Sequence, residues 1–215
     1  MAKPPWNLTG NGYIFIFNFP RDFVEECGFI PPHLDGCYWG GLGAVMLVDY
    51  HTTPVGPYQE ALFVPGLFDY ADHRLYSITK IYVSSIDSVL GGQDNWGIPK
   101  ELAHFNITPI SDTIERFTMS QDQRVLLDVT IKTRGPKIPF NTRWSPIKPA
   151  LIQNHAKRDL ITRPEGKARV GLAQIEDINI DSASFPDFSH LRPLAQIHAQ
   201  DFTLVFPVPK ILRST

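Results

Sequence analysis

The chain has 215 residues, of which 43% are hydrophobic and 20% are charged, so it is long enough for one sizeable core. Its formal net charge of -2 and its isoelectric point near 6.4 provide no electrostatic basis for binding nucleic acid or an anionic membrane. No run of about 18 apolar residues is present, so no segment is expected to span a bilayer. The amino terminus lacks the apolar stretch of a secretion signal, and two cysteines are too few for a disulfide framework. We therefore expect a cytoplasmic protein with reduced thiols.

The sequence pattern in the first half of the chain predicts short strands and little helix. Its apolar segments are separated by turn residues, and the whole chain has 19 prolines and 15 glycines with few long helical patterns. Strands are predicted at residues 13–19, 40–50, 60–64 and 77–83. A short helix is predicted at 21–28, where apolar residues recur at helical spacing. Ser84 and Ser85 are expected to cap a single helical turn at 86–90.

The second half predicts an antiparallel meander. Strands are predicted at residues 103–107, 114–119, 125–133, 170–182 and 197–208. The stretch 135–165 contains five prolines and is expected to be a long crossover without regular structure. The fold class that follows is mainly β with a few short helices, a single domain over residues 1–215 closed as an antiparallel barrel or cone.

Lys100 ends the segment 91–100, which reads Gly-Gly-Gln-Asp-Asn-Trp-Gly-Ile-Pro-Lys. Proline restricts the backbone before the lysine and glycine permits close approach, an arrangement suited to holding an amine in a dry pocket. A buried amine can lose its proton and attack a carbonyl carbon. Bringing its pKa from about 10.4 to about 7 requires roughly 4 to 5 kcal/mol, which burial or a neighbouring cation can supply. The alternative interpretation is a surface turn with an exposed lysine.

Glu60 lies within an otherwise apolar predicted strand. A carboxylate there is unfavourable unless it is paired or protonated. It can be an edge-strand charge that faces water, or it can pair with a buried amine as a proton donor or acceptor.

These two segments together resemble the acetoacetate decarboxylase superfamily. The resemblance rests on Gly-Pro-Tyr-Gln-Glu at residues 56–60 and on Gly-Gln-Asp-Asn-Trp-Gly-Ile-Pro-Lys at 92–100. Weaker similarity extends to the proline-rich turn at 29–34 and to the closing strand, so nearly the whole chain is covered.

The resemblance implies a β-cone that encloses an apolar pocket, in which Lys100 forms a Schiff base with a small ketone or keto acid and Glu60 assists proton transfer. The residues that it implies for substrate binding are Tyr58, Gln93, Asp94 and Trp96. It also implies that no external cofactor is needed and that the protein forms a homo-oligomer.

Three positions depart from the family pattern. Glu101 stands where the decarboxylases have a second lysine, and a carboxylate in contact with the amine would raise its pKa. If this segment is extended, the side chains of Lys100 and Glu101 diverge, and Lys100 then depends on desolvation alone. Gly12 stands where the family has an arginine that binds the substrate carboxylate, and Gln93 replaces another arginine. Arg74 or Arg143 could substitute for the missing anchor.

Without that anchor, decarboxylation of acetoacetate itself is less favoured than related aldol, dehydration or hydrolytic chemistry at the same imine. A competing hypothesis is a non-catalytic protein that holds a hydrophobic small molecule, for example in carotenoid or isoprenoid metabolism. A structural subunit is a third possibility. The scattered histidines have no metal-binding spacing, so no metal site is expected.

Overall fold

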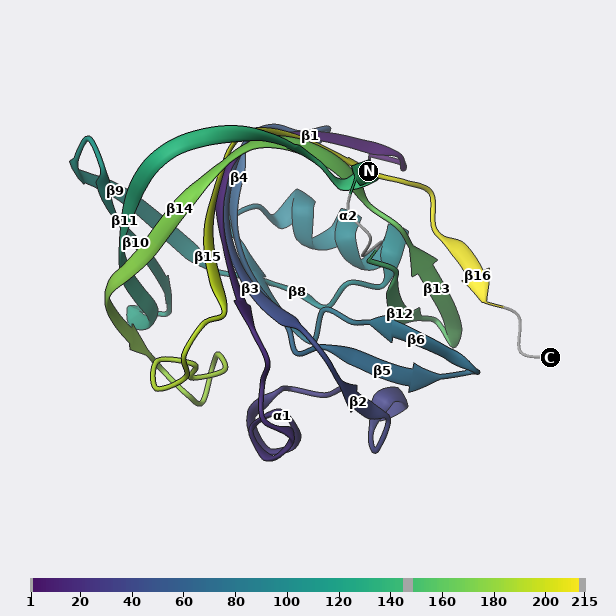
Figure 1. Cartoon of the computed structure of the whole chain (residues 1–215). Helices are drawn as coiled ribbons and strands as arrows, with labels where there is room; N and C mark the ends of the chain where they lie inside the picture. Colours follow the sequence, from purple (N-terminus) through teal and green to yellow (C-terminus); the bar gives the residue numbers. More distant parts are fainter. Residues whose placement is uncertain (1, 145–148, 213–215) are drawn as a thin grey trace.

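A computed structural model describes residues 2–144 and 149–212 and is drawn in Figure 1. Two α-helices lie in the described part of the chain, α1 at Arg21–Cys27 and α2 at Ile86–Trp96, with 3-10 turns at Pro32–Leu34 and Thr142–Trp144. The strands are β1 Trp6–Phe17, β2 Tyr38–Gly40, β3 Gly43–Thr52, β4 Tyr58–Val64, β5 Leu67–Tyr70, β6 His73–Tyr76, β7 Lys80–Val83, β8 Lys100–Leu102, β9 His104–Ser111, β10 Ile114–Gln121, β11 Arg124–Asn141, β12 Leu151–His155, β13 Arg158–Thr162, β14 Glu165–Ile180, β15 Ala195–Phe206 and β16 Lys210–Leu212.

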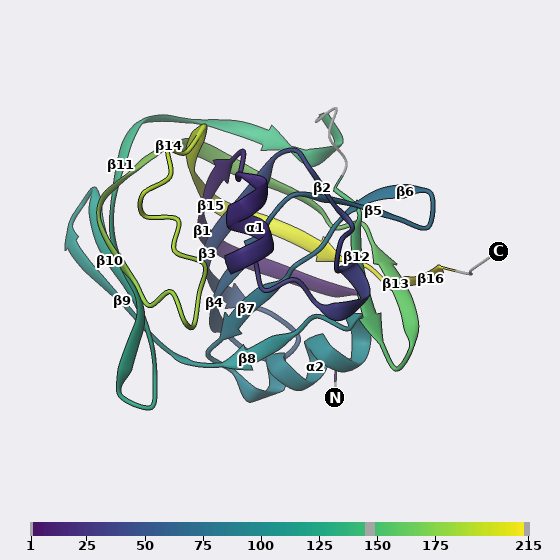
Figure 2. The ribbon, with the colours of Figure 1, turned by 90° about the horizontal axis from the view of Figure 1, so that it is seen from below.

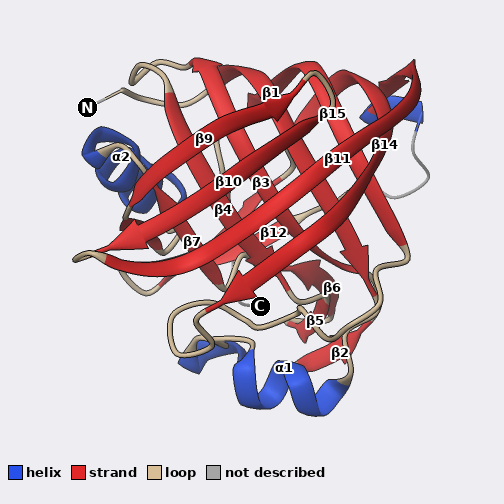
Figure 3. Ribbon diagram, turned by 90° about the vertical axis from the view of Figure 1, so that its left-hand side faces the viewer, coloured by secondary structure: helices blue, strands red, loops and turns tan. Residues whose placement is uncertain are grey.

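A large curled sheet dominates the architecture. Its ten strands follow the order β8-β7-β4-β3-β1-β15-β14-β11-β10-β9. Neighbouring strands are antiparallel, except that β7 and β8 run parallel. The long strands lie side by side in Figure 3, and in Figure 1 they arch over α2. A second sheet of six strands, β16-β13-β12-β6-β5-β2, lies on the other side of α2.

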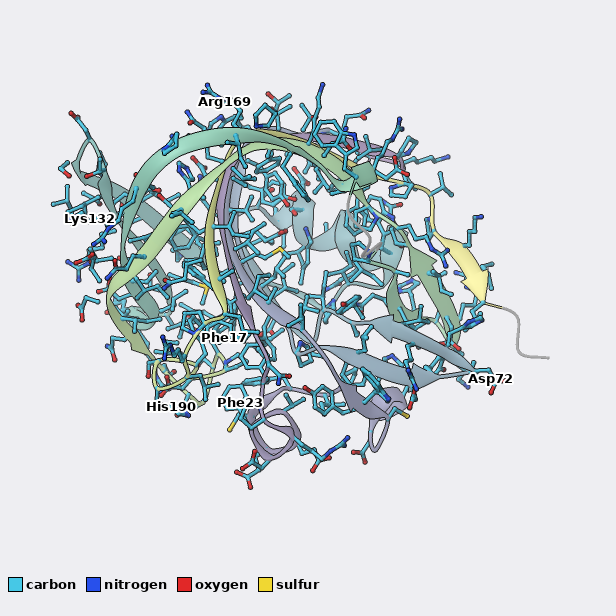
Figure 4. The ribbon with its side chains drawn as sticks, viewed as in Figure 1. Phe17, Phe23, Asp72, Lys132, Arg169 and His190 are labelled. Atoms are coloured by element: carbon cyan, nitrogen blue, oxygen red, sulfur yellow. The ribbon has the colours of Figure 1, made fainter. Side chains whose placement is uncertain are left out.

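Side-chain alternation gives the large sheet two different faces. One face carries the aromatic core inside the curl, where Phe15, Phe17 and Phe63 are fully buried. Figure 2 shows α1 lying across the lower end of this curl, and Phe23 of α1 stacks on Phe19 with 5.4 Å between ring centroids. In Figure 4, Phe17 points inward, whereas Lys132 and Arg169 point away from the curl.

The opposite face of the same strands packs against α2 and forms a second core. Its buried members include Trp6, Tyr50, Tyr58 and Trp96. The α2 helix therefore lies directly against the central strands of the large sheet, and polar groups on these elements meet in a dry environment.

The fold class predicted from the sequence is confirmed, but the crossover predicted at residues 135–165 is wrong. Strand β11 continues through Pro136 and Pro139 to Asn141, and β12 and β13 form a hairpin that pairs with β16. The register between β11 and β14 shifts between Arg134 and Ile138, so Pro136 lies where no ladder hydrogen bond is lost. Pro146 lies outside the described residues.

Another prediction was too short. The helical turn predicted at 86–90 is the start of α2, which continues to Trp96 despite two glycines. The hairpin of β5 and β6, with Asp72 at its turn in Figure 4, was not predicted. Neither described helix is long and apolar enough to cross a membrane. Within residues 2–144 and 149–212, His, Cys, Asp and Glu side chains form no group able to hold a metal ion.

Candidate active site

The end of α2 determines where Lys100 points. Ser85 caps the start of the helix by accepting a hydrogen bond from the Ser88 amide, at 3.3 Å. Gly97 ends it in the left-handed conformation at φ 69°, which glycine adopts without strain. Ile98 and Pro99 then reverse the chain, and Lys100 begins β8 with its side chain directed back at the helix.

Lys100 is buried, with 5% of its surface exposed. Its Nζ donates to Glu60 Oε2 at 2.9 Å, to Ser88 Oγ at 3.0 Å and to Tyr58 Oη at 3.4 Å. An ammonium group has three N–H donors, and each of these acceptors can take one. The lysine is thus fixed in one position between β4 and α2.

Glu60 is equally buried, with 4% of its surface exposed. Its second oxygen, Oε1, accepts a hydrogen bond from the Tyr50 hydroxyl at 3.1 Å. Both carboxylate oxygens therefore have partners, one cationic and one neutral. The sequence indicated that this carboxylate required a partner, and the side chain of Lys100 provides it.

The electrostatics of the pair differ from the sequence-based expectation of a neutral amine. Burial lowers the pKa of Lys100, but the negative charge of Glu60, with a smaller contribution from Tyr58, raises it, and the net pKa lies above its ordinary value. Burial also raises the pKa of Tyr58 and of Tyr50, so both hydroxyls keep their protons. At rest the site therefore holds an ammonium–carboxylate ion pair, and desolvation alone does not neutralise the lysine.

Gly92 of α2 leaves the room that the lysine stem occupies. A Cβ at this position would lie 2.6 Å from Lys100 Cδ and 2.8 Å from Cε, which is closer than carbon atoms approach. The close approach of glycine expected from the sequence is present, and it is made by the helix.

We expect Gly92→Ala to lower the free energy of unfolding by about 1–3 kcal/mol, because an added methyl group forces the lysine out of its position. This loss exceeds the gain in helix propensity of up to about 1 kcal/mol that alanine brings. Urea unfolding provides the measurement, with Leu90→Ala at an exposed position of the same helix as the control. A Gly92→Ala protein as stable as the wild type would contradict this packing.

Lys100 and Glu101 point in opposite directions. Glu101 is exposed and accepts a hydrogen bond from Lys80 Nζ at 2.6 Å. The divergence expected for an extended segment is confirmed, so the acidic residue next to Lys100 is neutralised on the other face of β8.

The remaining residues predicted for substrate binding lie in different surroundings. Trp96 is buried between Trp6 and Phe206, and its indole N–H donates to the Pro207 carbonyl at 2.7 Å. Gln93 is exposed and its side-chain amide donates to the Lys100 carbonyl at 2.9 Å, which ties α2 to β8. Asp94 is exposed on α2. Of this predicted group, only Tyr58 contacts the amine.

Two residues of the cluster were missed by the sequence analysis, Ser88 and Tyr50. Ser88 was assigned to a helical turn without a role, and Tyr50 to the end of a strand. The strand register could have identified Tyr50, because Tyr50 of β3 pairs directly with Tyr58 of β4. Such a pairing becomes visible only when the strands have been aligned.

Gly12 lies on the same face of the sheet as Glu60. Gly12 of β1 pairs with Val48 of β3, and Val48 pairs with Glu60 of β4. The absent arginine side chain would therefore start two strands away from the carboxylate. Arg74 and Arg143 do not replace it, since both are exposed and bound to the surface carboxylates of Asp69 and Glu165.

Comparisons with solved structures agree with this architecture. The acetoacetate decarboxylase of Legionella pneumophila subsp. pneumophila str. Philadelphia 1 is 12% identical, with a TM-score of 0.72 over 99% of this chain and 88% of that chain. An acetoacetate decarboxylase-like enzyme from Sphingomonas wittichii RW1 is 12% identical, with a TM-score of 0.69 over 100% of this chain and 95% of that chain. The enduracididine biosynthesis enzyme MppR, complexed with pyruvate, is 14% identical, with a TM-score of 0.67 over 100% of this chain and 92% of that chain.

A search of curated proteins finds no match. The family model described as acetoacetate decarboxylase matches residues 3–149, which include all strands of the curled sheet except β14 and β15, the helix α2 and every member of the Lys100 cluster. This match covers more than half of the chain, and the structural neighbours share its fold over nearly the full length. The chain belongs to the acetoacetate decarboxylase family.

Proposed function

We propose that this protein is a lyase that acts on a small ketone or keto acid through a Schiff base at Lys100, with Glu60 as the proton shuttle. The observation that carries the proposal is the buried contact between Lys100 Nζ and Glu60 Oε2, which is 2.9 Å long. An ion pair without a function would be expected at the surface and not between a sheet and a helix, because burying two charges is unfavourable.

The first step is a proton transfer within the pair. The ammonium of Lys100 gives a proton to Glu60 along their hydrogen bond, and the free amine attacks the carbonyl carbon of the substrate. One proton of the attacking amine moves to the former carbonyl oxygen to form a hydroxyl group, and the protonated Glu60 returns its proton to this hydroxyl group, which leaves as water. The product is a protonated imine on Lys100 and a carboxylate on Glu60, so no net proton is exchanged with solvent.

The imine supplies the driving force for the next step. Loss of carbon dioxide from a 3-keto acid, or of an α-proton to Glu60, leaves an electron pair that forms a C=C bond while the π pair of the C=N bond moves onto nitrogen, which gives a neutral enamine. Protonation of the enamine carbon, followed by hydrolysis, regenerates the lysine. The Tyr50 hydroxyl can hold Glu60 in position through both transfers, because it bonds the oxygen that Lys100 does not contact.

The reaction that follows imine formation is proposed to be decarboxylation, aldol chemistry or dehydration. MppR, a structural neighbour, has been solved with pyruvate and with the condensation product of pyruvate and imidazole 4-carboxaldehyde. A pyruvate-like keto acid is therefore a reasonable first substrate, alongside acetone and acetoacetate.

Reductive trapping tests the proposal. With sodium borohydride and each of these carbonyl compounds, the protein should gain the mass of the reduced adduct, and peptide mapping should place it at Lys100. Lys80 is the matched control, because it is a half-buried lysine on the neighbouring strand β7. Lys80→Ala should still be trapped and Lys100→Ala should not. An adduct absent from Lys100 across all three compounds would rule out the imine mechanism.

The raised pKa of Lys100 favours one alternative, a binding protein in which the ion pair has only a structural role. In that case borohydride would yield no adduct, and native mass spectrometry of the purified protein should reveal a bound apolar molecule that Lys100→Ala retains.

A further inference from the structure

The large sheet carries a cavity on the face opposite Glu60. Its volume is about 530 Å³, and its lining comes from β1, β3, β9, β10, β11 and β15. Asn11 and Asp49, which line it, form a cross-strand pair, and Asp49 pairs with Gln59. Successive residues of a strand face opposite sides, so Glu60 points away from this cavity. A volume of this size lies within the range of roughly 300–1,000 Å³ that is usual for small-molecule sites.

One wall of the cavity is built from two stacked rings. The rings of Tyr13 and His198 lie 5.0 Å apart at an interplanar angle of 22°. The Tyr13 hydroxyl donates to the Glu115 carboxylate, which reaches across from β10. These contacts fix a carboxylate and an aromatic surface next to each other.

His198 is left with an unused hydrogen-bonding atom. Its Nδ1 is buried and has no hydrogen-bond partner among the described residues. Burial and, to a smaller extent, the charge of Lys137 lower the pKa of His198 to about 4, against an opposing effect of Asp201. The ring is therefore neutral at physiological pH, and a buried polar atom without a partner is unfavourable unless a ligand or water satisfies it.

The charges around the cavity favour a cation. Asp49, Asp112 and Glu115 line it with a formal charge of -3, and Lys137 contributes +1, which gives -2 in all. The Lys137 ammonium already donates to the side chain of Gln200. Leu47, Ile107 and Phe117 supply apolar surface beside these groups.

We propose that this cavity binds a small organic amine, with its ammonium group at Glu115 and its carbon skeleton against the apolar wall. The anionic lining, the ordered carboxylate and the unpartnered imidazole nitrogen together match a ligand that offers N–H donors and a hydrophobic body. This second site lies behind the sheet from Lys100 and does not depend on imine chemistry.

Calorimetric titration of the full chain tests the assignment with three probes that share a benzyl group and differ in charge, namely benzylamine, benzyl alcohol and phenylacetate. Benzylamine should bind at least about tenfold more tightly than phenylacetate, which corresponds to about 1.4 kcal/mol. The ring nitrogens of His198 should shift in nitrogen NMR spectra when benzylamine is added.

Two variants localise the binding. Glu115→Gln, which keeps an acceptor for Tyr13, should weaken benzylamine binding by about tenfold because the ion pair with the ammonium is replaced by a hydrogen bond to an uncharged amide. His198→Phe keeps the stacked ring but removes the ring nitrogens, and it should also weaken the binding of benzylamine. Asp72→Asn, an acid at the exposed turn of the β5–β6 hairpin, should leave the affinity unchanged. The proposal is overturned if benzylamine does not bind, if phenylacetate binds as well, or if Glu115→Gln binds benzylamine like the wild type.

Discussion

Glu60→Gln should reduce turnover by about 10²–10⁴-fold, because glutamine cannot accept the α-proton of the imine. The reaction to follow is exchange of the α-hydrogens of whichever carbonyl compound the wild-type protein traps best, measured by proton NMR in deuterium oxide. The geometry of the site should survive, since the glutamine oxygen can still accept hydrogen bonds from Lys100 or Tyr50.

The same variant should still form the trapped adduct. With the negative charge of Glu60 removed, burial becomes the main influence on the pKa of Lys100, and burial lowers it. The amine is then neutral over a wider pH range and can attack without a base. If Glu60→Gln still forms the adduct at Lys100 but no longer exchanges α-hydrogens, then Lys100 is the nucleophile and Glu60 is the separate proton shuttle. Full exchange activity in Glu60→Gln would show that another group carries the proton.

Lys100→Met should lower the free energy of unfolding by about 3–5 kcal/mol, because it leaves the Glu60 carboxylate buried without its countercharge. Urea unfolding near neutral pH is the measurement. The double variant Lys100→Met with Glu60→Gln should recover most of that loss, since no charge remains in the site. Equal losses in the single and double variants would mean that packing, and not charge pairing, determines the stability of this cluster.

The effect of Lys100→Met on stability should also depend on pH. The pKa of Lys100 in the folded protein is raised above the unfolded value of about 10.5. The stabilisation that the ammonium provides is therefore fully present below pH 10.5 and is lost as the pH rises through the higher, folded-state pKa. The difference between wild type and Lys100→Met should be constant near neutrality and should shrink only in strongly alkaline solution.

Much of the fold could be predicted from local pattern, because strands β3, β4, β7, β9 and β10 are alternating or continuous apolar segments bounded by turn residues. The prediction failed at 135–165, because prolines were assumed to interrupt strands there, as they do inside a regular hydrogen-bonded ladder. A register shift between Arg134 and Ile138 makes them compatible with a strand. Bulges of this kind depend on the partner strand, which no local pattern contains.

In the candidate site, too, some features could be predicted from the local sequence and others depend on contacts in the folded chain. Glu60 stood out because it lies in an apolar segment, and Lys100 because proline and glycine lie beside it, and the two side chains do meet. The pKa of Lys100 could not be predicted, since its sign depends on whether burial or the 2.9 Å contact with Glu60 dominates. The resemblance implied Gln93 and Asp94 for substrate binding, and the α2 helix places both on its exposed side.

The connection between α2 and β8 determines which of two opposite charges enters the protein. Gly97, Ile98 and Pro99 form a link of fixed length, and Lys100 and Glu101 follow on alternate sides of a strand. If that link were one residue longer, the side chains of β8 would exchange faces. The glutamate would then point toward Glu60 and the lysine toward Lys80. Like charges would then face each other on both sides, so the length of this short turn is as strongly constrained as the glycine at its start.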